Sequence, residues 1–213
     1  MSSTKQKIID IAVSLFNQDG LVNVKMRDIA EAAGISPGNL TYHFSKKDDI
    51  LEAIHQQIIN ERSSLLASVK LIPSIANIHE QLIPLMELYK KYQFFYLDIT
   101  EISRAYPEIA DIQREHIKAQ ISYIKAILDY SVGSGNMVAE PRAGYFQELS
   151  HAVWMILSFW LTQQLIRGDD GDFYEDARRS MWNLVFPLLT EKGRQKLSKI
   201  YEYQTVEGLR DDA

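Results

Sequence analysis

Apolar residues recur at intervals of three and four along almost the whole chain. Such intervals run through residues 8–16, 50–69, 109–128 and 146–165. They place side chains on one face of an α-helix, whereas a half-buried β-strand requires an interval of two. No segment keeps an interval of two for long, and the sequence has few glycines and prolines to interrupt helices. The sequence therefore predicts an all-α fold.

The 213 residues contain no cysteine. This excludes a disulfide framework, a zinc–thiolate site and a thiol nucleophile. The polar segment 1–7 does not resemble a signal peptide. The most apolar stretch, residues 152–161, is about half the length of a membrane span. We therefore expect a cytoplasmic protein without a membrane segment, and no motif calls for a cofactor.

Capping residues, glycines and prolines divide the chain into helices of two lengths. Three short helices are expected first: one ends at Gly20, the next ends at Gly34, and the third begins with Ser36 and Pro37. Ser45 to Asp48 has the pattern of a capping box and opens a long fourth helix. We expect the long helices over residues 45–70, 74–96, 97–105, 108–131, 142–167 and 172–190, with a polar helical tail after Gly193. The change in helix length predicts one domain over residues 1–46 and a second over residues 47–213.

The residues around Gly34 have the spacing of a helix-turn-helix. Ala30 lies four residues before this glycine and Leu40 lies six residues after it. A small side chain allows two helices to cross closely, and the glycine takes the left-handed turn between them. Ile29, Ala33 and Ile35 occupy the remaining core positions. The alternative is an ordinary helical hairpin in which Gly34 only caps a helix.

In this arrangement the third helix presents its small and polar side chains outward, a set that suits the DNA major groove. These residues are Gly38, Asn39, Thr41, Tyr42 and His43.

Residues 27–51 resemble the DNA-binding signature of the tetracycline-repressor (TetR/AcrR) family. The resemblance covers about residues 7–51 and centres on Tyr42-His43-Phe44 and the following Lys47. It implies an N-terminal three-helix DNA-binding domain and a C-terminal helical bundle for ligand binding and dimerisation. It also implies phosphate contacts by Tyr42, His43 and Lys47, base contacts by Gly38, Asn39 and Thr41, and an inward-packed Phe44.

The sequence departs from the family pattern at Val24-Lys25, where the family usually has threonine, often followed by serine or threonine. Valine can neither cap a helix nor offer a hydroxyl to a phosphate. We therefore expect Asn23 to cap the second helix and Lys25 to contact a phosphate through its charge. Further predicted DNA-binding residues at the margins of the motif are Arg27, Ser36 and Lys46.

The net charge of −5 at first argues against a polyanionic partner. Residues 1–50, however, contain six basic and six acidic residues, so the excess of acid belongs to the rest of the chain.

We expect a homodimer that places two recognition helices in successive major grooves of double-stranded DNA with a palindromic operator. Binding should be weak without a matching sequence and sensitive to salt.

Aromatic residues are dense in two segments of the second domain, residues 89–96 and 154–160. Most of them are explained by core packing, but five aromatics within eight residues cannot all face one core. We therefore expect an apolar pocket for a small lipophilic effector. The predicted pocket residues are Tyr92, Tyr96, Tyr123, His151 and Trp154.

Two apolar stripes in the last long helices predict a dimer interface, the alternative being a monomeric core. Their predicted interface residues are Leu157, Leu161, Trp182, Val185, Phe186 and Leu189.

Two other functions are compatible with a helical bundle. The first is a ferritin-like di-iron enzyme, because Glu52-x-x-His55 and Glu148-x-x-His151 both have the required helical spacing. The second is a helical protein–protein adaptor. No phosphate loop or nucleophile elbow is present. The reading that accounts for most residues is a transcriptional repressor, not an enzyme, that an effector releases from its operator.

Overall fold

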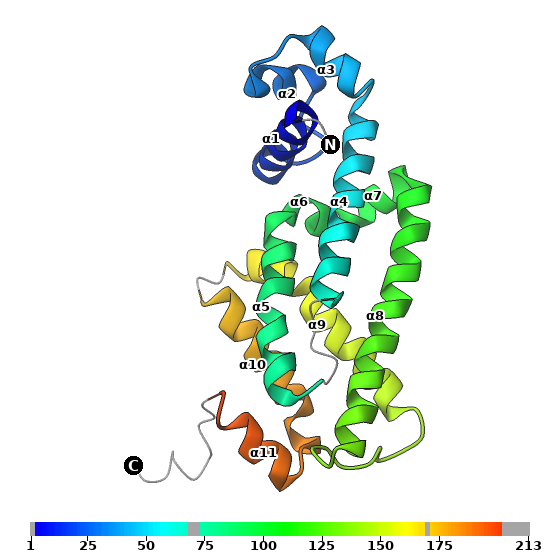
Figure 1. The fold of residues 1–213 in the computed structure, drawn as a ribbon, viewed down its shortest axis with the longest axis vertical. Helices are drawn as coiled ribbons and strands as arrows, with labels where there is room; N and C mark the ends of the chain where they lie inside the picture. The colour runs from blue at the N-terminus through cyan, green and yellow to red at the C-terminus, as the bar shows by residue number, and fades with distance from the viewer. Residues whose placement is uncertain (1–2, 68–72, 169–170, 202–213) are drawn as a thin grey trace. The chain divides into compact units, whose positions relative to one another are not determined.

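A computed structural model describes residues 3–67, 73–168 and 171–201. These residues form eleven α-helices and one short 3-10 turn (Figure 1). The only strand-like pairing among them is a single antiparallel bridge between Met137 and Leu189. The prediction of an all-α fold is confirmed.

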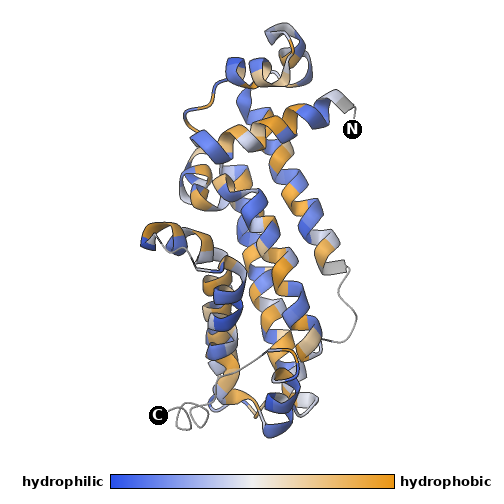
Figure 2. Ribbon diagram, turned by 90° about the vertical axis from the view of Figure 1, so that its left-hand side faces the viewer, coloured by the Kyte–Doolittle hydropathy of each residue, from blue (hydrophilic) through white to orange (hydrophobic). Residues whose placement is uncertain are grey.

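The helices follow the order that the sequence predicts, with different ends in several places. They are α1 (Ser3–Asp19), α2 (Met26–Ala33), α3 (Pro37–His43), α4 (Lys47–Ala67), α5 (Ile75–Lys91), α6 (Gln93–Leu97), α7 (Ile99–Ala105), α8 (Pro107–Gly133), α9 (Tyr145–Arg167), α10 (Phe173–Val185), the 3-10 turn η1 (Phe186–Leu188) and α11 (Glu191–Leu197). Figure 2 shows hydrophobic residues recurring along these helices between hydrophilic ones. Within the described residues, no helix is both long and apolar enough to cross a membrane.

The chain divides into two compact units. Of the described residues, the first unit contains 3–67, 85–117 and 161–168. The second unit contains 73–84, 118–160 and 171–201. Helices α5, α8 and α9 each contribute to both units. The predicted domain boundary after residue 46 stays a prediction.

The helix-turn-helix at the start of the first unit forms as its local signals predict. Gly34 follows α2 with a φ of 65°, a left-handed conformation that favours glycine. Ser36 caps α3 by accepting a hydrogen bond from the Asn39 backbone N–H, and Pro37 is the first residue of the helix. Ile29, Ala30, Ala33, Leu40 and Phe44 are buried, and Ile35 is half-buried.

Two predicted helix caps are wrong. The Lys25 backbone N–H donates to the Asp28 carboxylate at the start of α2, whereas the Asn23 side chain turns back and donates to the Asp19 carbonyl. Before α4, the carboxylate that accepts from Ser45 and Lys46 belongs to Asp49 and not to Asp48. In both places a carboxylate from the first turns of the helix accepts hydrogen bonds from backbone N–H groups that have no partner inside the helix.

The predicted helix over residues 74–96 is interrupted at Tyr92, where α5 gives way to α6. The cause is Asn17 of α1. Its side-chain amide donates to the Lys91 carbonyl at 2.9 Å and accepts from the Phe94 backbone N–H at 3.1 Å. Both groups would otherwise belong to a continuous helical hydrogen-bond ladder. Phe16 and Phe94 pack edge to face beside this contact, with ring centroids 5.1 Å apart.

In the second unit, the predicted helix over residues 172–190 ends at Val185 and continues as the turn η1, which contains Pro187. The last helix, α11, begins before Gly193 because Thr190 caps it and accepts from the Gly193 N–H. Gly193 lies against the Asn136 carbonyl so closely that a Cβ atom would collide with that oxygen. The absence of a side chain is therefore what allows α11 to pack there.

Candidate DNA-binding surface and effector site

The recognition helix α3 separates its buried and exposed side chains sharply. Leu40 is buried beneath it, whereas Tyr42 is 84% exposed. Asn39 and Thr41 are also exposed. The Thr41 hydroxyl donates to the Pro37 carbonyl at 2.7 Å, and among the described residues the Asn39 side-chain amide has no hydrogen-bond partner. An exposed amide of this kind is suited to reading the edge of a base.

The other predicted DNA-binding residues also belong to the first unit. Exposed members are Lys25, Arg27, Ser36, Gly38 and Lys46, and His43 is half-buried. Lys46 lies 3.4 Å from the Asp48 carboxylate. Apart from His43, these side chains are accessible to a DNA backbone, and their roles stay predictions.

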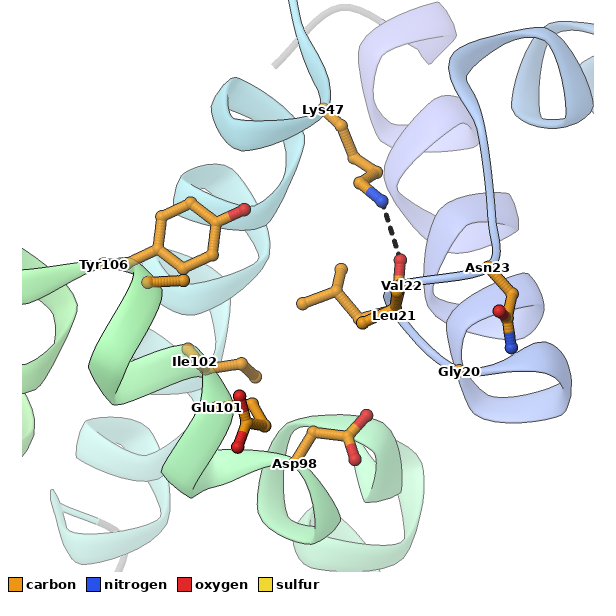
Figure 3. A pocket seen from close by; sticks show the side chains of 10 residues that line it. Gly20, Leu21, Val22, Asn23, Lys47, Asp98, Glu101, Ile102 and Tyr106 are labelled. Atoms are coloured by element: carbon orange, nitrogen blue, oxygen red, sulfur yellow. Dashed lines mark hydrogen bonds between the residues drawn. The ribbon is translucent and has the colours of Figure 1, made fainter.

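Lys47 is positioned differently from the other basic residues. Its ammonium group donates to the Leu21 carbonyl at 2.8 Å (Figure 3). It also donates to the Val24 carbonyl at 3.0 Å, and both carbonyls belong to the link between α1 and α2. Two of its three N–H groups are therefore occupied within the chain. In this conformation Lys47 fastens the link to the start of α4, and only the remaining N–H is left for the predicted phosphate contact.

A cavity of about 440 Å³ lies next to this lysine, between the α1–α2 link and α7 (Figure 3). Its lining residues are Gly20, Leu21, Val22, Asn23, Lys47, Asp98, Glu101, Ile102, Ala105 and Tyr106. The Tyr106 hydroxyl donates to the Asp48 carboxylate at 2.8 Å, and burial together with this carboxylate raises the pKa of Tyr106 to about 12. This hydrogen bond ties the start of α4 to the residue that follows α7.

Two of the predicted effector residues, Tyr92 and Tyr96, lie in the first unit. Tyr92 is fully buried, and its hydroxyl donates to the Glu61 carboxylate at 2.8 Å. Glu61 also forms an ion pair with Lys91 at 2.7 Å. Tyr92 is therefore a satisfied core residue in this conformation. The buried Tyr96 hydroxyl, in contrast, has no hydrogen-bond partner within residues 3–67, 73–168 and 171–201, and burial raises its pKa.

The other three predicted effector residues lie in the second unit. Trp154 is half-buried, and its indole N–H donates to the Gln120 side-chain oxygen at 3.1 Å. Tyr123 is partly exposed and His151 is exposed on α9. A pocket that includes all five residues stays a prediction.

The sequence reasoning missed a group of buried polar side chains in the first unit. His55 and Arg62 of α4 are 3% and 8% exposed. The His55 ring stacks on Phe95 with centroids 5.4 Å apart, and its Nε2 lies 3.0 Å from the Gln113 side-chain nitrogen. Burial lowers the pKa of His55 to about 4, and the charges of His116 and Arg62 act in the same direction. The available signal was Arg62 itself, a charged residue within the apolar series Ile58, Arg62, Leu65.

The di-iron alternative is not favoured by these positions. The His55 ring contacts the Gln113 amide and stacks on Phe95. Glu52 is exposed, and Glu148 forms an ion pair with Arg142. In residues 3–67, 73–168 and 171–201, no group of three or more acidic and histidine side chains is arranged to hold a metal ion.

The predicted dimer residues stay predictions, and most of them are buried within the single chain. Trp182 is only 3% exposed and donates its indole N–H to His79 at 3.1 Å. Val185, Leu189 and Leu157 are buried in the same chain, and Leu161 and Phe186 are half-buried. A side chain covered by its own chain offers little area to a partner, whereas Leu161 and Phe186 are partly accessible. The apolar residues that α9 leaves exposed are Met155, Phe159, Leu165 and Ile166.

Comparison with known families decides the identity of this fold. The family profile described as "Bacterial regulatory proteins, tetR family" matches residues 8–54, and the TetR profile described as "Bacterial transcriptional repressor" matches residues 50–197. The chain belongs to the TetR family. These two matches meet close to the start of α4 and together cover the helix-turn-helix and most of the remaining helices.

Individual TetR-type proteins are similar over different lengths. The probable HTH-type transcriptional regulator YttP of Bacillus subtilis is 32% identical over 98 residues, which is 46% of this chain and 47% of YttP. The matched region thus spans about half of that relative. Among solved structures, a TetR-family regulator from Marinobacter aquaeolei has a TM-score of 0.84 at 23% identity, covering 94% of this chain and 97% of that one. A putative regulator from Saccharomonospora viridis in complex with choline has a TM-score of 0.71 at 21% identity, covering 90% and 100%. These structures share the TetR fold.

Proposed function

We propose that this TetR-family protein is a ligand-responsive, DNA-binding transcriptional regulator. It acts as a repressor that an effector releases from a palindromic operator, and it works in the cytoplasm by binding and not by catalysis. The observation that carries the proposal is the division of α3, in which Leu40 anchors the helix while Asn39, Thr41 and Tyr42 are exposed. Burial fixes the orientation of the helix, and exposure leaves the outer side chains free to meet DNA.

In this proposal, helix α4 transmits the binding of an effector to the DNA-binding helices. At its start, Lys47 holds the link between α1 and α2, and Asp48 accepts from Tyr106. About 22 Å further along the same helix lies Arg62. A shift of this rigid helix would therefore move both contacts and change the orientation of α3. A coupling free energy of about 1–3 kcal/mol is enough to weaken DNA binding by a factor of roughly 5–150.

The proposed homodimer uses the exposed apolar face of α9. Met155, Phe159 and Ile166 follow one another at intervals of four and seven, so they lie on one side of the helix. Ile166 is 79% exposed in the single chain. Apolar side chains at helical spacing and accessible to solvent are what a helix-to-helix interface requires.

The test is selection of bound sequences from random double-stranded DNA, followed by gel shifts. We expect a palindrome whose half-site centres are separated by about 10 base pairs or a multiple of this spacing. Asn39→Ala should change the preferred bases. Tyr42→Ala should weaken binding to all sequences alike and reduce the salt dependence.

Arg104→Ala is a matched control, because Arg104 is exposed in the same unit but lies on α7 and pairs with Glu101. It should leave both affinity and base preference unchanged. Failure to enrich any sequence at micromolar protein would contradict the proposal, as would an Asn39→Ala variant that selects the wild-type sequence with wild-type affinity.

A further inference from the structure

Arg62 carries a buried positive charge without a counter-ion among the residues that the structure describes. It lies in the C-terminal half of α4, in the first unit, and is 8% exposed. Its one hydrogen bond in the described residues is a long one, 3.4 Å from Nη2 to the Tyr89 hydroxyl oxygen, and its Nε–H has no acceptor. None of the carboxylates in the described residues lies within ion-pair distance of Arg62. Burial of an unpaired charge has an unfavourable free energy, because the charge loses its hydration. An anion bound beside Arg62 would offset this cost.

The described groups around Arg62 offer further donors and, among them, no charged acceptor. Tyr89 and Tyr96 lie against each other with ring centroids 4.4 Å apart. In the described part of the chain, the Tyr96 hydroxyl is buried without a partner, and the Tyr89 hydroxyl only accepts, through its oxygen. The Nε–H of Arg62 and two phenolic hydroxyl groups are thus free to donate. Unsatisfied buried donors gathered at one place are suited to a ligand with several acceptor oxygens.

The surrounding histidines do not add to the charge. Burial lowers the pKa of both His55 and His116, and the positive charge of Arg62 contributes to the lowering in each case. Both imidazoles are therefore neutral at neutral pH, and Arg62 supplies a single positive charge. One charge is balanced by a monoanion, whereas a phosphate dianion would leave an uncompensated negative charge in a buried place.

We propose that Arg62, Tyr89 and Tyr96 form the recognition site for the carboxylate of an organic monocarboxylate effector with an apolar body. The planar guanidinium group binds a carboxylate through two parallel hydrogen bonds, and the phenolic hydroxyls complete its acceptor sites. The rings of Tyr89, Phe95 and Tyr96 provide the adjoining apolar surface. This inference rests on the proposed function, because it names the effector class of the same regulator.

The experiment compares carboxylates with their uncharged amides of the same shape. Benzoate with benzamide and hexanoate with hexanamide are the probes, measured by thermal shift and isothermal calorimetry on the full chain. For the wild type, we expect at least one carboxylate to bind about tenfold more tightly than its amide, since the amide leaves the arginine charge unpaired. The same carboxylate should release operator DNA in a gel shift.

Two variants of the site separate recognition from folding. Arg62→Met keeps a long apolar side chain but removes the charge, and should abolish the preference for carboxylate over amide. Because the charge is unpaired without ligand, this variant should melt at or above the temperature of the wild type. Tyr96→Phe removes only the unsatisfied hydroxyl and should weaken carboxylate binding about threefold or more without loss of stability. Arg104→Met is the exposed control, which should behave as the wild type.

Three results would overturn the proposal. The first is a wild type that none of the probes stabilises at about 10 mM, since ligand above its Kd must raise the melting temperature. The second is equal binding of acids and amides. The third is an Arg62→Met variant that melts more than about 4 °C below the wild type, which would assign Arg62 a structural role. Gel shifts without ligand test DNA binding separately, so loss of this inference is distinguishable from loss of the proposed function.

Discussion

Acidification should destabilise this protein through His55 before most carboxylates are protonated. The pKa of this histidine is about 4 in the folded chain and 6.5 in an unfolded one, chiefly because the ring is buried. As the pH falls through this window, the unfolded chain binds a proton that the folded chain does not bind. The free energy of unfolding therefore falls as the pH is lowered from 6.5 towards 4, and the full contribution is present above 6.5.

The size of the effect follows from the two pKa values. Each unit of difference corresponds to about 1.4 kcal/mol, so the complete shift is worth at most about 3 kcal/mol. Linkage gives a loss of about 2 kcal/mol between about pH 7.5 and about pH 5. His116 and His79 also have lowered pKa values, mainly through burial, and they add to the total pH dependence. A variant that removes only His55 is needed to isolate its share.

The assay is urea unfolding followed by circular dichroism, at one chain concentration and several pH values between about 7.5 and 5. His55→Gln replaces the imidazole with a neutral side chain. It costs stability at neutral pH, but the difference from the wild type should narrow by about 2 kcal/mol at about pH 5. His151→Gln, which removes an exposed histidine, is the matched control and should stay within about 0.5 kcal/mol of the wild type throughout. A constant difference between His55→Gln and the wild type across the series would refute this account.

Further changes probe the helix-turn-helix, the second unit and the dimer. Leu40→Ala removes the buried anchor of α3 and should cost about 2–5 kcal/mol of unfolding free energy in urea, with a parallel loss of DNA binding; a cost below about 1 kcal/mol would show that α3 is held by other contacts. Gly193→Ala introduces a methyl group against the Asn136 carbonyl and should lower the melting temperature by several degrees; an unchanged melting temperature would mean that α11 is free to move away. Phe159→Glu places a charge on the exposed face of α9 and should shift sedimentation from dimer to monomer, while a wild-type dimer in this variant would place the interface elsewhere.

The two ends of α4 differ in whether their polar side chains have partners. The DNA-binding end of α4 is satisfied within the chain, because Lys47 and Asp48 both have partners. In the C-terminal half of the same helix, Arg62 has no counter-ion among the described residues, and the Tyr96 hydroxyl of α6 has no partner among them. Binding of a carboxylate would thus stabilise one arrangement of α4 over others. A ligand shifts a conformational equilibrium by its difference in affinity for the two states, and α4 is where this difference would arise.

Local sequence signals determined the helix-turn-helix. A left-handed glycine, a serine cap and a proline at the first helical position act within a few residues of one another, so Gly34, Ser36 and Pro37 predict the turn and the start of α3 correctly. The spacing of Ala30 and Leu40 likewise predicts which side chains are buried. Burial of Leu40 also fixes which side of α3 faces the rest of the unit. The other side chains of this short helix therefore point outward.

Contacts between distant residues decided the rest. The helix is interrupted at Tyr92 because Asn17, far away in the sequence, bonds the neighbouring Lys91 carbonyl and Phe94 N–H. An apolar stripe shows that one face of a helix is covered but not by what, so Trp182 proved to pack in its own chain rather than remain available to a partner. The sequence shows Arg62 only as a charged residue within an apolar series of a long helix, which does not say whether it is paired. The packing of α4 with α5 and α6 is what buries this side chain. The proposal of a carboxylate site depends on that burial without a counter-ion in the described residues.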